Sequence, residues 1–329
     1  MFYVYKMKEY ISPTSTKSDT SVISIMPIGE RFTFDNSVKI GSGTFGQVFI
    51  GFDKQDSKNV AIKRLQWPSN KEKKDIIRQE VSILSKLHHV NIASLVKAFR
   101  PSKLSKSIYI AMELCSGGEI FDVIVGRGHL TEENAKKVIR EMLSALAYCH
   151  RLGIAHLDLK PENILLSEKP SEDLTVPLPI IKLIDWGLSA EFETFDRCPE
   201  QCRRKGTPAY MAPEIFRRNY NEEADLWAVG VILYIMLNGI WPFDPDNIKP
   251  KFRGDHFHPP SRGAVRRVKL SDNYSDQVKN FVKRLIAYDT SDRLSAAEAL
   301  NDPWFNSVST TVVPPETVGR LKHFIKTKF

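Results

Sequence analysis

Hydrophobic and polar residues in the first third of the chain follow a pattern that predicts strands and a single main helix. Segment 38–52, VKIGSGTFGQVFIGF, predicts two strands around a glycine-rich loop, and segment 59–65, NVAIKRL, predicts a third. Segment 107–114, SIYIAMEL, predicts a further strand. Between them, apolar residues recur with the spacing of one helix face over 71–88, at positions 76, 77, 81, 84 and 87.

The rest of the chain is helical in its periodicity. Apolar residues between Thr131 and Gly153 predict an amphipathic helix that the threonine caps and the glycine ends. The run 226–237, LWAVGVILYIML, is apolar on every side and too short to cross a bilayer, so it predicts a fully buried helix. Further helices are expected near 275–287 and 295–301.

Together these patterns predict an α+β protein with two lobes. Residues 34–114 form a small β-rich lobe with one main helix, and residues 118–305 form a larger helical lobe. Residues 1–33 are rich in Ser and Thr and predict a mobile extension or a segment that packs late. Residues 306–329 are a basic C-terminal tail. Two loops, 167–179 and 244–263, are broken by proline and are expected at the surface.

Composition narrows the class of protein only modestly. The net charge of +8 comes from basic residues that are scattered along 329 residues, which favours solvated faces over a nucleic-acid surface. Four cysteines are too few for a disulfide framework in a chain of this length. Cys198 and Cys202 lack the neighbouring ligands that a zinc site needs. No nucleic-acid partner and no zinc are expected.

The N-terminus gives no targeting signal. MFYVYKMKEY lacks the apolar core of a signal peptide, and Phe2 excludes N-myristoylation. We therefore expect no transmembrane segment and a cytoplasmic location, with the nucleus as the alternative.

Candidate chemistry begins at the glycine-rich loop. Gly41, Gly43 and Gly46 would let backbone amides approach phosphate oxygens, although such a loop is also common in plain hairpins. A strand follows the loop, which argues against a dinucleotide-binding unit, where a helix would follow. Lys63 lies in the next apolar strand and could neutralise phosphate if Glu80 held it. The alternative is a lysine that reaches solvent and a glutamate on the surface.

The segment 154–165, IAHLDLKPENIL, concentrates three complementary groups. Asp158 can orient a hydroxyl, Lys160 can neutralise a phosphate, and the amide oxygen of Asn163 can hold a metal ion. Alone, the segment could be an ordinary turn. Asp185 belongs to a downstream Asp-Trp-Gly, which lies where phosphoryl transfer would need it.

GSGTFGQV, VAIK, HLDLKPEN, DWG and APE, in this order, resemble the motifs of a eukaryotic Ser/Thr protein kinase over residues 34–305. The resemblance implies the bilobal protein kinase fold, ATP and Mg²⁺ as cofactors, and protein substrates. It assigns Asp158, Lys160, Lys63 and Glu80 to catalysis, and Asn163 and Asp185 to the metal. The nucleotide-contacting set it implies is Ile40, Gly41, Gly43, Gly46, Val48, Ala61, Lys63, Met112, Glu113, Cys115, Glu119, Glu162 and Leu165.

The resemblance also carries finer expectations. Lys160 within LKPEN and Thr207 within GTPAYMAPE match kinases that phosphorylate Ser and Thr. MELCSGGEIFD and DPWF look most like the calcium/calmodulin-dependent group, including the kinase domains of protist calcium-dependent protein kinases. Glu119 matches a residue that contacts ribose and a basic substrate residue. Its alternative role is a helix N-terminal carboxylate favoured by the dipole. Glu214 with Arg293 matches a buried ion pair, and Asp225 a carboxylate that caps the loop around Asp158.

Three positions depart from the family pattern. Leu157 stands where most kinases have an arginine that receives an activation-loop phosphate, so weak dependence on such phosphorylation is expected. Trp186 replaces the usual phenylalanine and brings an indole N–H that wants a partner. Segment 244–263 departs from the usual docking helix, and partner choice cannot be inferred from it.

The tail sequence VGRLKHFIKTKF places apolar residues at helical spacing among basic ones. Such a helix suits a calmodulin-like or EF-hand regulator, and an ordinary surface helix is the alternative. The chain has no D-x-[DN]-x-[DN]-G loop, so calcium would have to act through another segment or protein. The rival to an active kinase is a catalytically inactive scaffold with the same fold, which the retained Lys63, Asp158, Asn163 and Asp185 disfavour.

Overall fold

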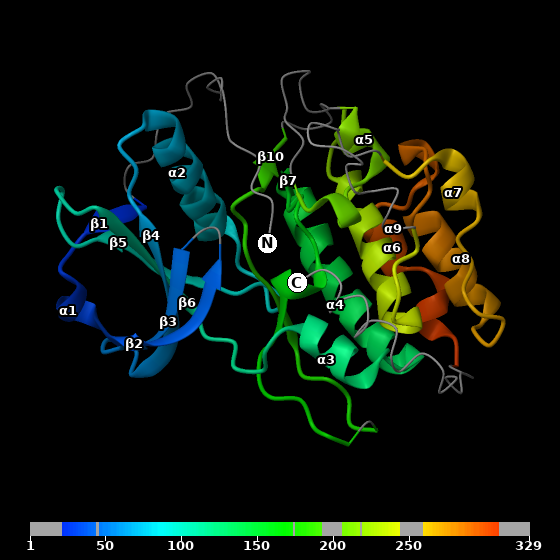
Figure 1. The fold of residues 1–329 in the computed structure, drawn as a ribbon, viewed down its shortest axis with the longest axis horizontal. Helices are drawn as coiled ribbons and strands as arrows, with labels where there is room; N and C mark the ends of the chain where they lie inside the picture. Colours follow the sequence, from blue (N-terminus) through cyan, green and yellow to red (C-terminus); the bar gives the residue numbers. More distant parts are fainter. Residues whose placement is uncertain are drawn as a thin grey trace, which may run out of the picture. The chain divides into compact units, whose positions relative to one another are not determined.

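The computed structural model describes residues 22–43, 46–173, 175–192, 206–217, 219–243 and 259–308. The chain divides into two compact units, with the boundary between Ser116 and Gly117. The first is a twisted sheet with one long helix, and the second is mostly helical (Figure 1). This architecture confirms the predicted α+β fold. Cys198 and Cys202, most of loop 244–263, and the basic tail from residue 309 onward lie outside the described residues.

The sheet of the first unit has six strands in the order β1-β5-β6-β4-β3-β2. All neighbours pair antiparallel except β1 and β5, which are parallel. The strands are β1 Ile23–Ile25, β2 Phe32–Gly43, β3 Gly46–Asp53, β4 Lys58–Gln66, β5 Leu95–Arg100 and β6 Ser107–Glu113.

Residues 22–33 are an ordered part of the first unit and not a mobile extension: they include β1, the short helix α1 and the start of β2. Ile23 and Ile25 pair with Ala98 and Arg100 of β5, and the short helix α1 spans Ile28–Arg31. Phe32 is fully buried, and its ring stacks on Phe99 with centroids 5.3 Å apart. Of the two expectations for this region, packing therefore holds for the residues that the structure describes.

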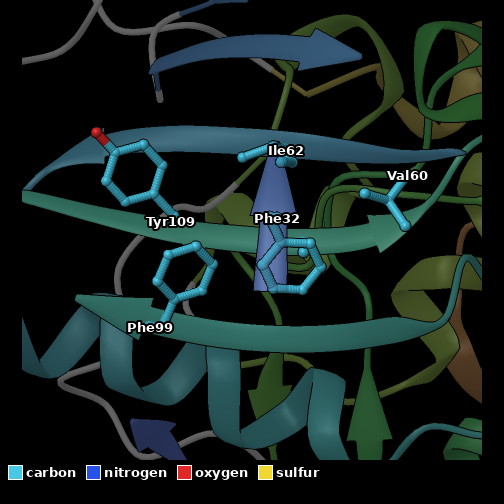
Figure 2. Packing of buried hydrophobic residues seen from close by; sticks show 6 residues of the cluster. Phe32, Val60, Ile62, Phe99 and Tyr109 are labelled. Carbon is cyan, nitrogen blue, oxygen red and sulfur yellow. The ribbon is translucent and has the colours of Figure 1, made fainter. Parts of the chain in front are cut away.

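One face of the sheet carries the hydrophobic core of the first unit (Figure 2). Phe99 stacks on Tyr109 as well as on Phe32, so aromatic rings from three strands lie together. Val60 and Ile62 of β4 point into this cluster. Because side chains alternate along a strand, Ala61 and Lys63 point to the opposite face.

Helix α2, Lys71–Lys86, confirms the helix predicted over 71–88. Asn70 caps its first turn by accepting hydrogen bonds from the amides of Glu72 and Lys73. Val81, Ile83 and Leu84 are buried, and Glu80 is buried among them. A carboxylate in this position requires a partner, because burying an unpaired charge is costly.

The second unit is built around two long helices. Helix α4, Glu132–Arg151, begins at Thr131, whose hydroxyl accepts from the amide of Asn134 as the sequence predicts. Helix α6, Glu223–Asn238, is buried at every position from Ala224 to Leu237. The other helices are α3 Ile120–Arg127, α5 Pro213–Phe216, α7 Arg262–Arg266, α8 Asp276–Leu285 and α9 Ala296–Leu300. None of the helices in the described part of the chain is long and apolar enough to cross a membrane.

Two pairs of short strands frame the loops of this unit. Strand β7 (Ile154–Ala155) pairs with β10 (Ala190–Glu191), and β8 (Ile164–Leu166) pairs with β9 (Ile181–Leu183). The surface loop predicted at 167–179 connects β8 to β9 and is anchored at its end. There Leu178 is buried, and its amide donates to the side-chain oxygen of Asn134.

Buried polar contacts fix the ends of the second unit. Arg293 pairs with Glu214 through both guanidinium nitrogens, which confirms the predicted ion pair, and it also donates to the carbonyls of Glu223 and Ala287. The indole nitrogen of Trp304 donates to the buried carboxylate of Glu132 at 2.7 Å. The first set of contacts ties α5 and α6 to the segment before α9, and the second ties α4 to the segment after α9.

Candidate active site

The first unit contributes a glycine hairpin. Strands β2 and β3 meet at Gly43 and Gly46, with Gly41 opposite Val48. Gly46 has φ +134°, and a Cβ there would collide with the carbonyl oxygen of Arg64 and the side chain of Leu65. Only glycine fits this position, because the backbone is left-handed and lies directly on β4.

Lys63 and Glu80 form a buried ion pair in the same unit. The Lys63 ammonium lies 2.7 Å from the Glu80 carboxylate, and the two side chains are 11% and 5% exposed. The alternatives of a solvent-directed lysine and a surface glutamate are therefore wrong. The pair leaves a fixed cation on the sheet face opposite the aromatic core, where it can meet a phosphate.

Three of the residues expected to contact the nucleotide base lie close to this pair on neighbouring strands. Val48 is opposite Lys63 on β3, and Met112 is opposite Ala61 on β6. The amide of Glu113 donates to the carbonyl of Ser94 at 2.9 Å, and its carboxylate accepts from the Ser94 hydroxyl. This amide is already used within the unit, so a ligand at Glu113 would meet its carbonyl group instead.

In the second unit, Asp158, Lys160 and Thr207 form a tight polar cluster. The Thr207 hydroxyl donates to one oxygen of the Asp158 carboxylate at 2.8 Å, and Lys160 lies 3.3 Å from the other oxygen. Lys160 also donates to the Thr207 hydroxyl at 3.2 Å. The loop 154–165 is therefore more than a turn: it holds a carboxylate and an ammonium beside one hydroxyl.

Asp225, at the start of α6, holds the backbone of this loop. Its carboxylate accepts from the amides of His156 and Leu157 at 2.9 and 2.8 Å and contacts the His150 ring at 3.0 Å. Burial disfavours the charged form, but the hydrogen bond and the charge of His150, aided by His156, outweigh burial and lower the pKa of Asp225. The predicted capping role of this carboxylate is confirmed.

The loop backbone is strained at Leu157, which has φ +64°. Leucine rarely adopts this left-handed conformation, so the hydrogen bonds that the loop amides donate to Asp225 hold the loop in a shape it would not take alone. The Leu157 side chain is only 5% exposed. An apolar, buried side chain here offers no positive charge to a phosphate.

Asn163 and Asp185 lie on neighbouring segments. Asn163 donates through its side-chain nitrogen to the Asp158 carbonyl at 2.8 Å, and its backbone carbonyl accepts from Ile184, the residue before Asp185. The side-chain oxygen of Asn163 and the Asp185 carboxylate are oxygen donors of the kind that Mg²⁺ prefers. The described residues contain no group of three or more His, Cys, Asp or Glu that could hold a metal alone. A cation here would need further oxygen ligands from its substrate and water.

Glu119 lies at the N-terminal end of α3 without a capping hydrogen bond from its side chain. Burial, followed by the nearby carboxylates of Asp122 and Glu162 and opposed by Lys160, raises its pKa to about 7. Glu119 is the N-cap residue of α3, the position that the helix-terminus alternative describes, and it also belongs to an acidic group beside Lys160. The two roles are compatible.

Tyr210 and His156 lie beside the site, and the sequence analysis assigned neither of them a role there. Tyr210 is buried, and its pKa lies well above its ordinary value because of burial and the nearby Glu162 and Asp158. His156 packs on Trp186 with ring centroids 4.6 Å apart. Trp186 is 1% exposed, and its indole N–H has no hydrogen-bond partner among the described residues. The partner expected from its sequence is not found there.

A family model described as "Protein kinase domain" matches residues 34–305. Calcium-dependent protein kinase 4 of Plasmodium berghei (strain Anka) is 34% identical over 278 residues, which are 82% of this chain and 49% of that protein. The probable serine/threonine-protein kinase fhkC of Dictyostelium discoideum is 34% identical over 289 residues, 85% of this chain and 45% of that protein.

A plant protein kinase is similar to this chain to the same degree. Calcium-dependent protein kinase 7 of Arabidopsis thaliana is 34% identical over 306 residues, which are 88% of this chain and 52% of that protein. The chain thus spans about half the length of the curated relatives it matches.

Proposed function

Because the chain belongs to the protein kinase family, we propose that it transfers the γ-phosphate of ATP to serine or threonine hydroxyls of protein substrates. The observation that carries this proposal is the cluster of Asp158, Lys160 and Thr207. It combines a carboxylate, a cation and a hydroxyl within hydrogen-bonding distance. Phosphoryl transfer depends on positioning and charge neutralisation, and this cluster supplies both.

Each residue of the cluster has a distinct task in the proposed reaction. The substrate hydroxyl oxygen attacks the γ-phosphorus, ADP departs, and Asp158 receives the hydroxyl proton. Lys160 neutralises charge that develops on the transferred group. Thr207 donates to one Asp158 oxygen and thereby fixes the orientation of the carboxylate, and the second oxygen, which lies beside Lys160 and Asn163, would receive the substrate proton.

The remaining predicted residues bind ATP and Mg²⁺ in this proposal. Gly41, Gly43 and Gly46 cover the phosphates, and Lys63, held by Glu80, contacts them. Asn163 and Asp185 hold Mg²⁺, which neutralises phosphate charge when bound. The oxygen-only donor pair supports Mg²⁺ over a softer metal.

The acidic group around Glu119 supports a preference for basic residues before the phosphoacceptor. Glu119 and Glu162 lie close enough for each to disfavour ionisation of the other. A substrate arginine or lysine that entered this site would relieve that repulsion. The favourable interaction would be absent for a neutral peptide, so discrimination between substrates follows.

A transfer assay with ATP, Mg²⁺ and a basic Ser-containing peptide tests the activity. We expect Asp158→Ala to lose about 10³-fold or more in kcat. The matched control is Asp276→Ala, because its side chain is 98% exposed and belongs to an exposed pair. Equal signals from the parent protein and Asp158→Ala, with both folded by circular dichroism, would support the inactive scaffold instead.

We also propose regulation by a calmodulin-like or EF-hand protein through the basic tail, and a cytoplasmic or nuclear location. The calcium-dependent relatives by name and the amphipathic spacing of 318–329 support the first proposal. Isothermal titration with Ca²⁺-loaded calmodulin, against a chain that ends at residue 308, tests it. Fluorescence imaging of the tagged chain tests the location.

A further inference from the structure

The net positive charge of the chain belongs to its first unit. Residues 1–116 contain 18 Lys and Arg against 10 Asp and Glu, whereas residues 117–329 contain 29 of each. The surplus of the first unit therefore equals the net charge of +8 of the whole chain. The Lys63–Glu80 pair is neutral as a pair, so the proposed reaction does not account for this surplus.

Much of the surplus lies on the hairpin between β5 and β6. From Leu95 to Met112 the chain has four basic residues and no acidic one. Lys103 and Lys106 near the hairpin tip are exposed, and Leu104 between them is 93% exposed. An apolar side chain held in water between two lysines stabilises nothing within the unit.

The hairpin is anchored to Trp67, which follows β4. The Trp67 amide donates to the carbonyl of Lys106 at 2.8 Å. Arg100 donates to the carbonyls of Lys103 and Ser105 at 2.8 and 2.7 Å, and its guanidinium carbon lies 4.6 Å from the Trp67 ring centroid. These contacts fix the hairpin tip, so Leu104 and its flanking lysines are presented on a rigid turn.

Helix α2 supplies the other side of this surface. The guanidinium carbon of Arg78 lies 5.6 Å from the Trp67 ring centroid, and its side chain is 40% exposed beside Asp75. Lys71 and Lys73, in the first turn of α2, are exposed. We call the set Trp67, Arg78, Lys103, Leu104 and Lys106 the Trp67 surface.

We propose that the Trp67 surface docks an acidic peptide segment of a partner protein. Its carboxylates would lie on Lys103, Lys106 and Arg78, and an apolar side chain would cover Leu104. Two guanidinium groups already lie over the indole of Trp67, so it is not open to stack on a nucleic-acid base. A polyanion without apolar groups would also leave Leu104 in water. An acidic peptide with an apolar residue therefore fits better than nucleic acid.

Docking at this surface is separate from the proposed reaction. Arg78 and Glu80 are two residues apart on α2, and side chains at that spacing do not share a helix face. Glu80 faces Lys63, whereas Arg78 contacts Asp75 and Trp67. The proposal can therefore fail or succeed whether or not the kinase function holds.

Fluorescence anisotropy tests the proposal on the full chain with a labelled peptide that has Glu-rich flanks around a Leu-Phe pair. We expect the double variant Lys103→Glu/Lys106→Glu to weaken binding about tenfold or more. Leu104→Ser should weaken it about threefold to tenfold through the lost apolar contact. Hydrogen exchange should show protection over 66–78 and 100–107 when the peptide binds.

The matched control is Lys39→Glu/Lys58→Glu, which makes the same charge change on exposed lysines of the same unit. Lys58 lies at the opposite end of β4 from Trp67, about 30 Å along the strand. We expect the control to change affinity less than about twofold. Three outcomes would overturn the proposal. The two double variants could weaken binding equally, or the peptide could fail to bind. A single-stranded oligonucleotide could also bind as well as the peptide, with an affinity that Leu104→Ser does not change.

Discussion

Single residues around Asp158 show how the site combines strain with neutralised charge. Leu157 takes a left-handed backbone conformation, and the Asp225 carboxylate binds the amides of Leu157 and His156. This arrangement aims Asp158 at Thr207 without help from a charged side chain at position 157. The orientation of the carboxylate is therefore set by α6 and by Thr207, both within one unit.

The first prediction concerns phosphorylation of the activation segment. Leu157 is buried and uncharged, so it cannot pair with a phosphate as an arginine could. We expect phosphatase-treated protein to keep its activity within about twofold, because the loop is already held by Asp225. Peptide phosphorylation before and after treatment, with phosphate loss verified by mass spectrometry, is the measurement. Abolished activity after treatment would contradict this account.

Introducing the missing arginine is a second prediction at the same position. Leu157→Arg would place a charged side chain where a buried apolar one now packs. We expect it to destabilise the fold by about 3 kcal/mol or more, whereas the volume-conserving Leu157→Met costs under about 1.5 kcal/mol. Urea unfolding of the two variants measures both values. Equal midpoints for the two variants would show that the site accommodates the charge.

A third prediction follows from the raised pKa of Glu119. With a pKa of about 7, this carboxyl is mostly protonated below pH 7 and mostly charged above it. Only the charged form attracts a basic substrate residue, so KM for a basic peptide should fall as pH rises through 7. Glu119→Gln should remove that pH dependence while KM for a neutral peptide stays flat. A pH profile of KM that is identical in the variant and the parent would refute it.

At the scale of elements, the sequence predicted the long helices and failed on short strands. Helices α2, α4 and α6 have caps or unbroken apolar runs, which are local signals. Strand β1 has only three residues and pairs with β5 some 75 positions away, so its partner is invisible in the local pattern. The polar contacts of Asp225 and Thr207 were equally non-local, and only the family resemblance pointed to them.

The brace between α5 and the segment before α9 gives a fourth prediction. Arg293 is fully buried and pairs with Glu214, so Arg293→Ala would leave a buried carboxylate without its partner. We expect a loss of about 3–5 kcal/mol in the free energy of unfolding. Lys279→Ala removes the partly exposed partner of the exposed Asp276 and should change the urea midpoint little. Similar midpoints for both variants would mean that the brace contributes little.

At the scale of the whole molecule, the proposed chemistry is divided between two units that differ in charge and architecture. Lys63 and Glu80 belong to the basic, strand-rich unit, and Asp158, Asn163 and Asp185 belong to the electrically balanced helical unit. Motif order along the chain was enough to predict both groups. Their local geometry needed the structure, because Glu80 lies 17 residues from Lys63, Thr207 lies 49 residues from Asp158, and Asp225 lies 68 residues from Leu157.

The last prediction asks whether the two units act on one reaction. Lys63→Met removes the phosphate-neutralising cation, and Asp158→Asn removes the proton acceptor, so each should lower kcat/KM by about 10³-fold. If both residues serve the same transition state, the double variant should be little worse than the poorer single variant, because residues that act as a unit are not additive. Lys63→Met also leaves Glu80 buried without its cation, so thermal unfolding must accompany the kinetics. All three variants must be folded for this comparison. If the decrease in kcat/KM of the double variant equals the product of the two single decreases, the two units contribute independently rather than to a shared transition state.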